Sequence, residues 1–169
     1  MKTKPFLVSA AAAAAVAVFA VPQAASAATT YSDSASGFEY SATSTEGKFS
    51  GTASGALPGG WQATVDHTPL SPNATVTGGD FCLTTVLNGT ATLVHGAVAG
   101  GSVTRTNPGA TGCVNQYYAV NLTLGHVTRN GSGSGSGSYA GTLVHHRSSV
   151  FGYCLTYSAT IGGPLTLTF

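Results

Sequence analysis

The sequence predicts an all-β protein, and its composition, its alternating pattern and its turn residues each point to that class. Glycine accounts for 23 of the 169 residues and charged residues for 7%. The helix formers Lys, Glu and Leu are scarce, which excludes an all-helical fold. From Gly37 onward, apolar and polar residues alternate with period two between Gly, Pro and Asn residues, as in strands with one buried face. We therefore expect eight to ten short antiparallel strands.

The N-terminal segment has the pattern of an export signal. Two lysines precede the uncharged segment 6–21, which is rich in Ala and Val, and Ala25-Ser26-Ala27 follows as a small-residue cleavage site. We predict cleavage after Ala27 and a secreted, bacterial-type protein with no membrane span after signal removal. A membrane anchor is the competing interpretation, but the apolar stretch is short for a bilayer and is closed by Pro22.

The mature chain has little charge. Beyond residue 27 it carries four basic and five acidic side chains, a formal charge of −1. Each neutralised phosphate needs a cation, so nucleic acid and anionic lipid are excluded as main partners. Residues 28–36 are mostly Ser, Thr and Ala and predict a flexible start. Residues 37–169 then form a single β domain of modest size.

In the first half of the domain, we expect strands wherever apolar residues alternate with polar ones. The segment 38–66 contains three such runs, with apolar positions at Phe38, Tyr40, Ala42, Phe49, Gly51, Ala53, Trp61, Ala63 and Val65. The segments 81–87 and 90–97 flank Asn88-Gly89. That dipeptide is a signal for a tight hairpin turn, although it is also compatible with a bulge in one long strand.

The second half alternates more clearly. Tyr118, Val120, Leu122 and Leu124 share one face of a predicted strand, and the odd-numbered residues of 151–161 share one face of another. The segments 139–147 and 165–169 supply further strands. Between them, the Gly-Ser alternation of 131–138 predicts a flexible linker that joins two strands as a mobile loop.

We predict that these strands form a single antiparallel up-and-down β-barrel, with a two-sheet sandwich as the alternative, because both architectures limit exposed edges. Aromatic and branched residues fall on one face of nearly every run, and the opposite face is small and hydroxylated. Glycine also lies inside several runs, where closure of a barrel demands bends. These two features favour the barrel.

Three histidines are the candidate metal ligands. His67, His95 and His126 each continue, by period two, the apolar face of the run before them. The last two end strands that run in the same direction, so we expect the three imidazoles to gather at one rim. Imidazole nitrogens ligate zinc and copper. However, no paired-ligand spacing accompanies these histidines, so we favour polar strand ends without a metal, and we predict no cofactor.

A second polar group, His145-His146-Arg147, lies near the end of a predicted strand. The planar guanidinium of Arg147 could bind an anionic group of a ligand at the rim, although such a cluster is more often a polar strand end. The chain has no G-x-S-x-G segment and no phosphate loop, and it offers only Asp66 with Asp80 as an acidic pair. An enzyme is therefore the least favoured class of function, and we assign no catalytic residues.

Four segments of the last third of the chain carry a family resemblance: 112–120, 143–147, 151–159 and 165–169. Together they resemble a group of small secreted actinobacterial β proteins, to which we attach no activity. The resemblance implies export and a β fold but no mechanism. It also implies that Cys113 and Cys154 belong together, and it leaves Cys82 unexplained.

Export makes the three cysteines candidates for oxidation, and their odd number leaves at least one without a partner inside the chain. An up-and-down order places Cys113 and Cys154 at the same end, separated by one strand. That is about 10 Å as two strand spacings, so a bond requires the loop carrying Cys113 to fold across the strand's end. Cys82 with Cys113 is the runner-up. We predict a Cys113–Cys154 bond, with the Cys82 thiol on the hydroxylated side of its strand.

Two functional interpretations follow from this pattern. The first is a binding module whose barrel holds a small, mostly apolar ligand, with histidines adding polarity at the rim. The alternative is an extracellular surface or cell-wall interaction protein without a small-molecule ligand. A barrel of eight strands can also be filled by its own side chains, so a cavity, or its absence, distinguishes the two.

Overall fold

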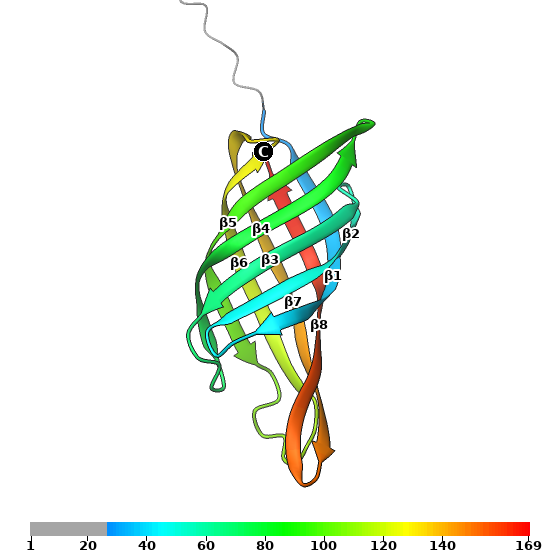
Figure 1. The fold of residues 1–169 in the computed structure, drawn as a ribbon. Coiled ribbons are helices and arrows are strands. Elements are labelled where there is room, and N and C mark those ends of the chain that lie inside the picture. Colours follow the sequence, from blue (N-terminus) through cyan, green and yellow to red (C-terminus); the bar gives the residue numbers. More distant parts are fainter. Residues whose placement is uncertain (1–26) are drawn as a thin grey trace, which may run out of the picture.

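Eight antiparallel strands close into a barrel in the computed structural model of this protein, which describes residues 27–169 (Figure 1). The strands are β1 (Thr30–Ala42), β2 (Glu46–Gly55), β3 (Gly59–His67), β4 (Ala74–Leu87), β5 (Thr90–Arg105), β6 (Gln116–Arg129), β7 (Ser132–Val150) and β8 (Tyr153–Thr168). Each strand pairs with its neighbour in sequence, and β8 pairs back with β1. The predicted up-and-down barrel is confirmed, with longer strands than the alternation indicated.

The interior combines aromatic and branched side chains with inward-facing glycines. Trp61, Phe49 and Phe81 are buried in one core cluster with leucines and valines of β3 to β8. Trp61 needs the small residues around it, because a Cβ on Gly37 would lie 2.8 Å from its Cζ2 atom. Glycine therefore makes room for the indole where β1 and β2 curve past it.

A buried carboxylate organises the end of the barrel at which the chain enters. Asp33 on β1 is buried, and its Oδ1 atom accepts a hydrogen bond of 2.7 Å from the backbone N–H of Leu57 in the β2–β3 turn. Leu57 itself has no exposed surface. The segment 28–36, predicted to be flexible, is thus largely strand from Thr30 onward, because both β2 and β8 pair with it. The predicted signal segment lies outside the described residues, apart from Ala27.

The predicted Gly-Ser loop is wrong, because residues 132–138 form the first part of β7. Ser136, Gly137 and Ser138 pair in register with β8, and Gly137 also pairs with Leu124 of β6. The composition resembles a linker, but strict alternation also suits a strand whose inward positions must be small. A Cβ on Gly137 would lie 2.8 Å from Leu167 Cδ2, so glycine permits close packing here.

Three hairpins end in two-residue turns of one kind. Asn88-Gly89, Asn130-Gly131 and Phe151-Gly152 all have positive φ at both positions, with φ of 53°, 49° and 50° at the first residue of each. This is the backbone of the type I′ turn, which suits the twist of paired strands and favours Asn-Gly. The hairpin predicted at Asn88-Gly89 is confirmed. The turn at Phe151-Gly152 departs from the Asn-Gly preference because its first residue is Phe.

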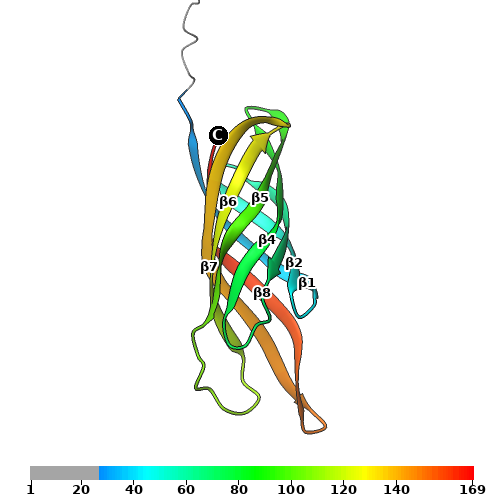
Figure 2. The same ribbon diagram turned by 90° about the vertical axis from the view of Figure 1, so that its left-hand side faces the viewer.

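The β7–β8 hairpin continues beyond the barrel wall. Figure 2 shows it projecting from the same end as the β5–β6 loop. The last β1–β8 pair is Phe38 with Thr160, and β6 begins opposite His145, so residues beyond these positions pair only within the hairpin. The predicted disulfide is confirmed: Cys113 of the β5–β6 loop bonds to Cys154 of the hairpin, with a Cα–Cα distance of 5.4 Å.

Candidate functional site

A cavity of about 370 Å³ opens at the end of the barrel that carries the hairpin. Its wall is mostly apolar and is built from seven strands, all but β4, with the β1–β2 turn and the β3–β4 loop. The apolar lining residues include Phe49, Val65, Leu70, Val103, Val120, Leu122, Leu143 and Ile161. Ligand sites of proteins are typically apolar cavities of a few hundred Å³ with a small number of polar groups. The barrel is therefore not filled at this end.

A smaller void of about 40 Å³ lies deeper in the barrel and shares Phe49, Val65, Leu122 and Ile161 with the cavity. Trp61 and Tyr139 line it as well. The Trp61 Nε1 and Tyr139 Oη atoms are buried without a hydrogen-bond partner, and burial raises the pKa of Tyr139 to about 12. Trp61 is the single tryptophan of the chain, so it reports on what enters from the cavity.

Two ionisable side chains face each other in the cavity. Glu39 Oε2 lies 3.6 Å from His145 Nε2, and the two side chains are only 12% and 18% exposed. This distance is too long for a hydrogen bond, and His145 Nε2 is buried with no hydrogen-bond partner among the described residues. Glu39 comes from β1 and His145 from β7, on either side of β8.

The surroundings oppose a charge on either member of this pair. Burial raises the pKa of Glu39 to about 7 from its usual 4.5. Burial is also the main cause that lowers the pKa of His145, and the positive charges of Arg147 and His146 lower it further. Loss of water destabilises the charged form of both groups. Near neutral pH, the pair therefore tends toward a neutral imidazole and a carboxyl group that readily holds a proton.

Tyr118 forms the next part of the polar wall. Its ring centroid lies 5.1 Å from that of His145, and its hydroxyl donates a 3.0 Å hydrogen bond to Gln116 Oε1. Burial raises the pKa of Tyr118, while Arg105 and Arg147 act in the opposite direction. The Nε atoms of both arginines are buried without a partner in the described part of the chain. The positively charged Arg105, on β5, and Arg147, on β7, thus come from the two strands that flank β6.

The pair also borders a second opening in the wall. A cleft of about 410 Å³ lies where β1 and β8 separate beyond Phe38, and it is lined by Tyr40, Tyr157 and Ser158. Glu39 and His145 line both this cleft and the central cavity. The two polar groups therefore stand where the interior meets the side of the barrel.

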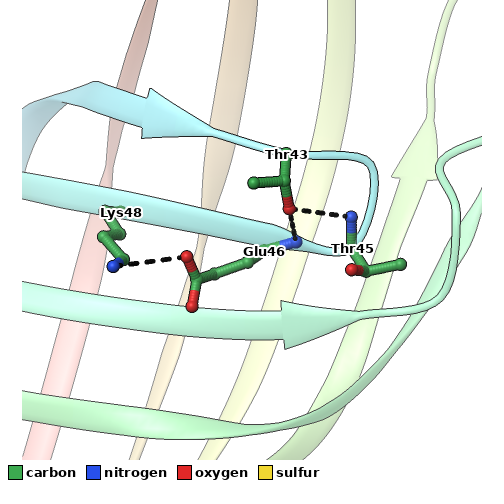
Figure 3. A network of polar contacts seen from close by, with 4 residues as sticks. All are labelled: Thr43, Thr45, Glu46 and Lys48. Atoms are coloured by element: carbon green, nitrogen blue, oxygen red, sulfur yellow. Dashed lines mark hydrogen bonds and ion pairs between the residues drawn. The ribbon is translucent and has the colours of Figure 1, made fainter.

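The β1–β2 turn forms part of the cavity rim and is held by local polar contacts (Figure 3). Thr43 Oγ1 accepts hydrogen bonds from the backbone N–H groups of Thr45, at 3.2 Å, and Glu46, at 3.0 Å. Lys48 Nζ lies 3.3 Å from Glu46 Oε1 on the exposed surface. This turn positions Thr43 and Ser44 beside the cavity, and Glu39 takes no part in the three contacts that hold it.

The structure does not bring the three predicted histidines together. His67 lines the cavity at the end of β3. His95 and His126 are exposed on the other side of the wall, on the neighbouring strands β5 and β6. Residues 27–169 contain no group of three His, Cys, Asp or Glu side chains that could hold a metal ion.

Strand parity explains the error for His95 and His126. On β5 the inward face is that of Thr92 and Val94, so His95 points outward with Leu93. On β6 the register shifts between Leu124 and Val127, and Val127 takes the inward position that period two assigns to His126. A bulge of this kind reverses the face of every following residue.

The predicted anion rim divides between the two faces of β7. His145 faces the cavity, whereas His146 Nε2 lies 3.0 Å from the hydroxyl of Thr160 and its Nδ1 lies 3.4 Å from Asn115 Nδ2. The backbone N–H of Arg147 donates to Asn115 Oδ1 at 3.1 Å. His146 thus bonds away from the cavity, whereas the charge of Arg147 acts on both His145 and Tyr118. Anion binding by these residues stays a prediction.

Sequence reasoning missed Glu39 as a site residue. Alternation assigned Phe38 and Tyr40 to the core, but both are about half exposed, and Glu39 points inward instead. Asp33 and Ala35 are the buried residues of β1, and they set the true parity. The small residues Ala35 and Gly37, in phase with Glu39, are the signal that could have indicated its inward position.

Cys82 lies half-buried on the outer side of β4, between the inward-facing Phe81 and Leu83. Its neighbours in a surface groove include Ser50, Gln62 and Thr84, as predicted for the hydroxylated side. Burial, and then the negative charge of Asp80, raise the pKa of its thiol. Cys82 is therefore remote from the cavity.

Comparison with known protein families, characterised proteins and solved structures finds no match to this chain. No helix in residues 27–169 is long and apolar enough to cross a membrane. The geometry of the cavity is thus the basis for a functional conclusion.

Proposed function

We propose that this protein is exported and holds a small, mostly apolar ligand in the cavity at the hairpin end of its barrel. The observation that carries the proposal is the cavity of about 370 Å³, whose apolar wall contains one buried polar pair, Glu39 and His145. An apolar wall gives affinity through burial of the ligand, and a few polar groups orient it. The disulfide suits an oxidising compartment outside the cytoplasm.

Binding of the uncharged fluorescent probe N-phenyl-1-naphthylamine tests this function. We expect the probe to bind with a blue-shifted, enhanced emission and to quench or shift the fluorescence of Trp61. The variant Val103→Phe fills the cavity with a larger side chain and should weaken binding at least tenfold. Val86→Phe is the matched control, because Val86 is exposed on the outer surface. Equal binding by both variants would place the probe outside the cavity and contradict the proposal.

A second candidate function is that of an extracellular surface or cell-wall interaction protein. The observation that favours it is the β7–β8 hairpin, where Phe151, Tyr153, Leu155 and Tyr157 are all more than half exposed. Co-sedimentation with isolated cell walls tests it, using the variant Tyr153→Ser/Leu155→Ser as comparison. Sedimentation that depends on these side chains, together with no probe binding, would favour this function over the first.

A further inference from the structure

The Glu39–His145 pair has a geometry that indicates what kind of ligand group the cavity takes, if the proposed ligand-binding function holds. The two facing atoms, Oε2 and Nε2, are 3.6 Å apart. They are too far apart to satisfy each other, but one oxygen atom can lie about 2.8 Å from both, the usual hydrogen-bond length for such groups. A group placed between them would give the buried Nε2 atom of His145 the partner that it lacks among the described residues and would also bond to the carboxyl group of Glu39. A buried polar atom that is left unsatisfied is costly.

The surroundings of the pair select against a charged group at that point. The site is dry enough to destabilise the negative charge of Glu39 and the positive charge of His145. A ligand carboxylate would meet the same loss of water as Glu39, whose raised pKa shows that the neighbouring positive charges do not offset burial there, and it would also be repelled when Glu39 is ionised. A ligand ammonium would meet the same loss of water as His145, together with the positive charges of Arg147 and His146.

An uncharged hydroxyl or carboxamide matches the pair in either arrangement of its proton. When Glu39 is protonated, its carboxyl group donates a hydrogen bond, and when it is ionised, its carboxylate accepts one. The Nε2 atom of the neutral His145 imidazole accepts or donates according to its tautomer. A hydroxyl group donates one proton and accepts through its lone pairs, so it bridges the two side chains whenever at least one of them donates. The remainder of the ligand then follows the apolar wall toward the void beside Trp61.

We propose that the ligand of this cavity carries an uncharged polar head, an alcohol or a carboxamide, that bridges Glu39 and His145 by hydrogen bonds, with its apolar chain directed into the barrel. The inference rests on the proposed function and adds the chemical class of the ligand. Glu39 and His145 are then the residues that determine specificity.

Four ligands with one alkyl chain and different heads test the inference: decan-1-ol, its methyl ether, decylamine and decanoate. Each is titrated against bound N-phenyl-1-naphthylamine at pH 8, above the pKa of about 7 of Glu39, so that its carboxylate mostly accepts and only a donating head can bond to it. We expect decan-1-ol to displace the probe at about tenfold lower concentration than the ether, which accepts but cannot donate, and at lower concentration than the amine or the acid. An ether or a charged compound that competes as well as the alcohol would overturn the inference.

The variant Glu39→Leu separates bridging from general apolar affinity. This variant should bind decan-1-ol about tenfold more weakly than wild type and should bind the ether with unchanged affinity. Glu39→Gln should recover part of the lost affinity for the alcohol. Glu46→Leu is the matched control, because Glu46 lies at the same end but pairs with Lys48 on the surface. Alcohol binding that Glu39→Leu does not weaken, in a variant with native circular dichroism, would also overturn the inference.

The two proposals fail in different ways. If wild-type protein does not bind the naphthylamine probe in the cavity, the ligand-binding function falls, and this inference falls with it. If the probe binds and Val103→Phe blocks it, but the alcohol shows no advantage over the ether, the function stands and only the uncharged bridging head is wrong.

Discussion

Glu39 Oε2 and His145 Nε2 face each other at 3.6 Å from opposite sides of β8, and neither side chain is more than one-fifth exposed. The pair stands at the junction of the central cavity and the cleft between β1 and β8. Burial shifts the pKa of each member toward its neutral form. The folded protein thus holds two groups that would both be charged more easily in water, which makes their contribution to stability depend on pH.

The first prediction is that Glu39 makes the protein less stable as the pH rises. Its pKa of about 7 in the fold lies above its usual 4.5, so the folded state binds the proton more tightly. Its favourable contribution is complete below about pH 4.5 and is lost as the pH rises through 7. The difference corresponds to about 3 kcal/mol. The titratable groups around it in the two openings are His67, Tyr118, His145, Tyr40 and Tyr157.

Urea unfolding of wild type and Glu39→Gln at pH 4.5, 6 and 8 measures this contribution. The variant should gain stability relative to wild type as the pH rises, and the gain isolates Glu39, because His145 is present in both proteins. His145 acts in the opposite sense: its lowered pKa favours the fold above about pH 6.5, and that stability is lost on acidification below it. A difference between variant and wild type that does not change with pH would contradict the assignment.

The second prediction concerns the buried hydrogen bond at the other end of the barrel. Asp33→Ala should lower the free energy of unfolding by about 2 kcal/mol, because the N–H of Leu57 loses its acceptor in a buried site. Asp33→Asn keeps an acceptor oxygen and should lose less. Asp80→Ala, at an exposed position of β4, is the control. Equal stability of the two alanine variants would show that the Asp33 contact adds nothing.

The third prediction is that Phe151→Asn stabilises the protein by about 1 kcal/mol. Phe151 has a φ of 50° and is 97% exposed, so it bears the cost of a left-handed backbone with no packing in return. Asparagine occupies the same position of the two other turns at Asn88 and Asn130. The reverse change, Asn88→Phe, should destabilise by a similar amount. Thermal unfolding of both variants checks the pair, and a shift of the same sign in both would refute the argument.

The fourth prediction is that the disulfide stabilises the fold and the hairpin most of all. The bond spans 41 residues, and a loop of that length corresponds to at most about 4 kcal/mol of chain entropy. Cys113→Ser/Cys154→Ser should lower the free energy of unfolding toward that limit. Hydrogen exchange should accelerate first in the β5–β6 loop and in the hairpin beyond His145, since this part of the hairpin pairs with no other strand.

Counting thiols checks the pairing itself. Denatured protein without reductant should take up one alkylating group, on Cys82, and reduced protein three. Cys82→Ser should leave no thiol before reduction and an intact Cys113–Cys154 bond. A linked peptide that contains Cys82 would be incompatible with the structure.

Much of the barrel was predictable because period two is a local property. The faces of Trp61, Phe49 and Tyr118, the turn at Asn88-Gly89 and the all-β class all follow from residues close together in sequence. The resemblance in the last third of the chain implied the Cys113–Cys154 pairing, which the structure confirms. Composition concealed the Gly-Ser start of β7 and the Ser- and Thr-rich start of β1, because small residues fit a flexible segment and a close strand contact equally well.

The sequence by itself determined the all-β class and the alternation within most strands, whereas only the tertiary structure decided the inward face of β1, of β5 and of the end of β6. A single bulge near His126 and an aromatic pair on the outside of β1 were enough to reverse the inferred faces. The proximity of Glu39 to His145 depends on closure of β8 against β1, which joins residues more than a hundred positions apart. Whether the barrel is hollow likewise depends on the volumes of the inward-facing side chains of all eight strands. The cavity therefore exists only once the wall has closed.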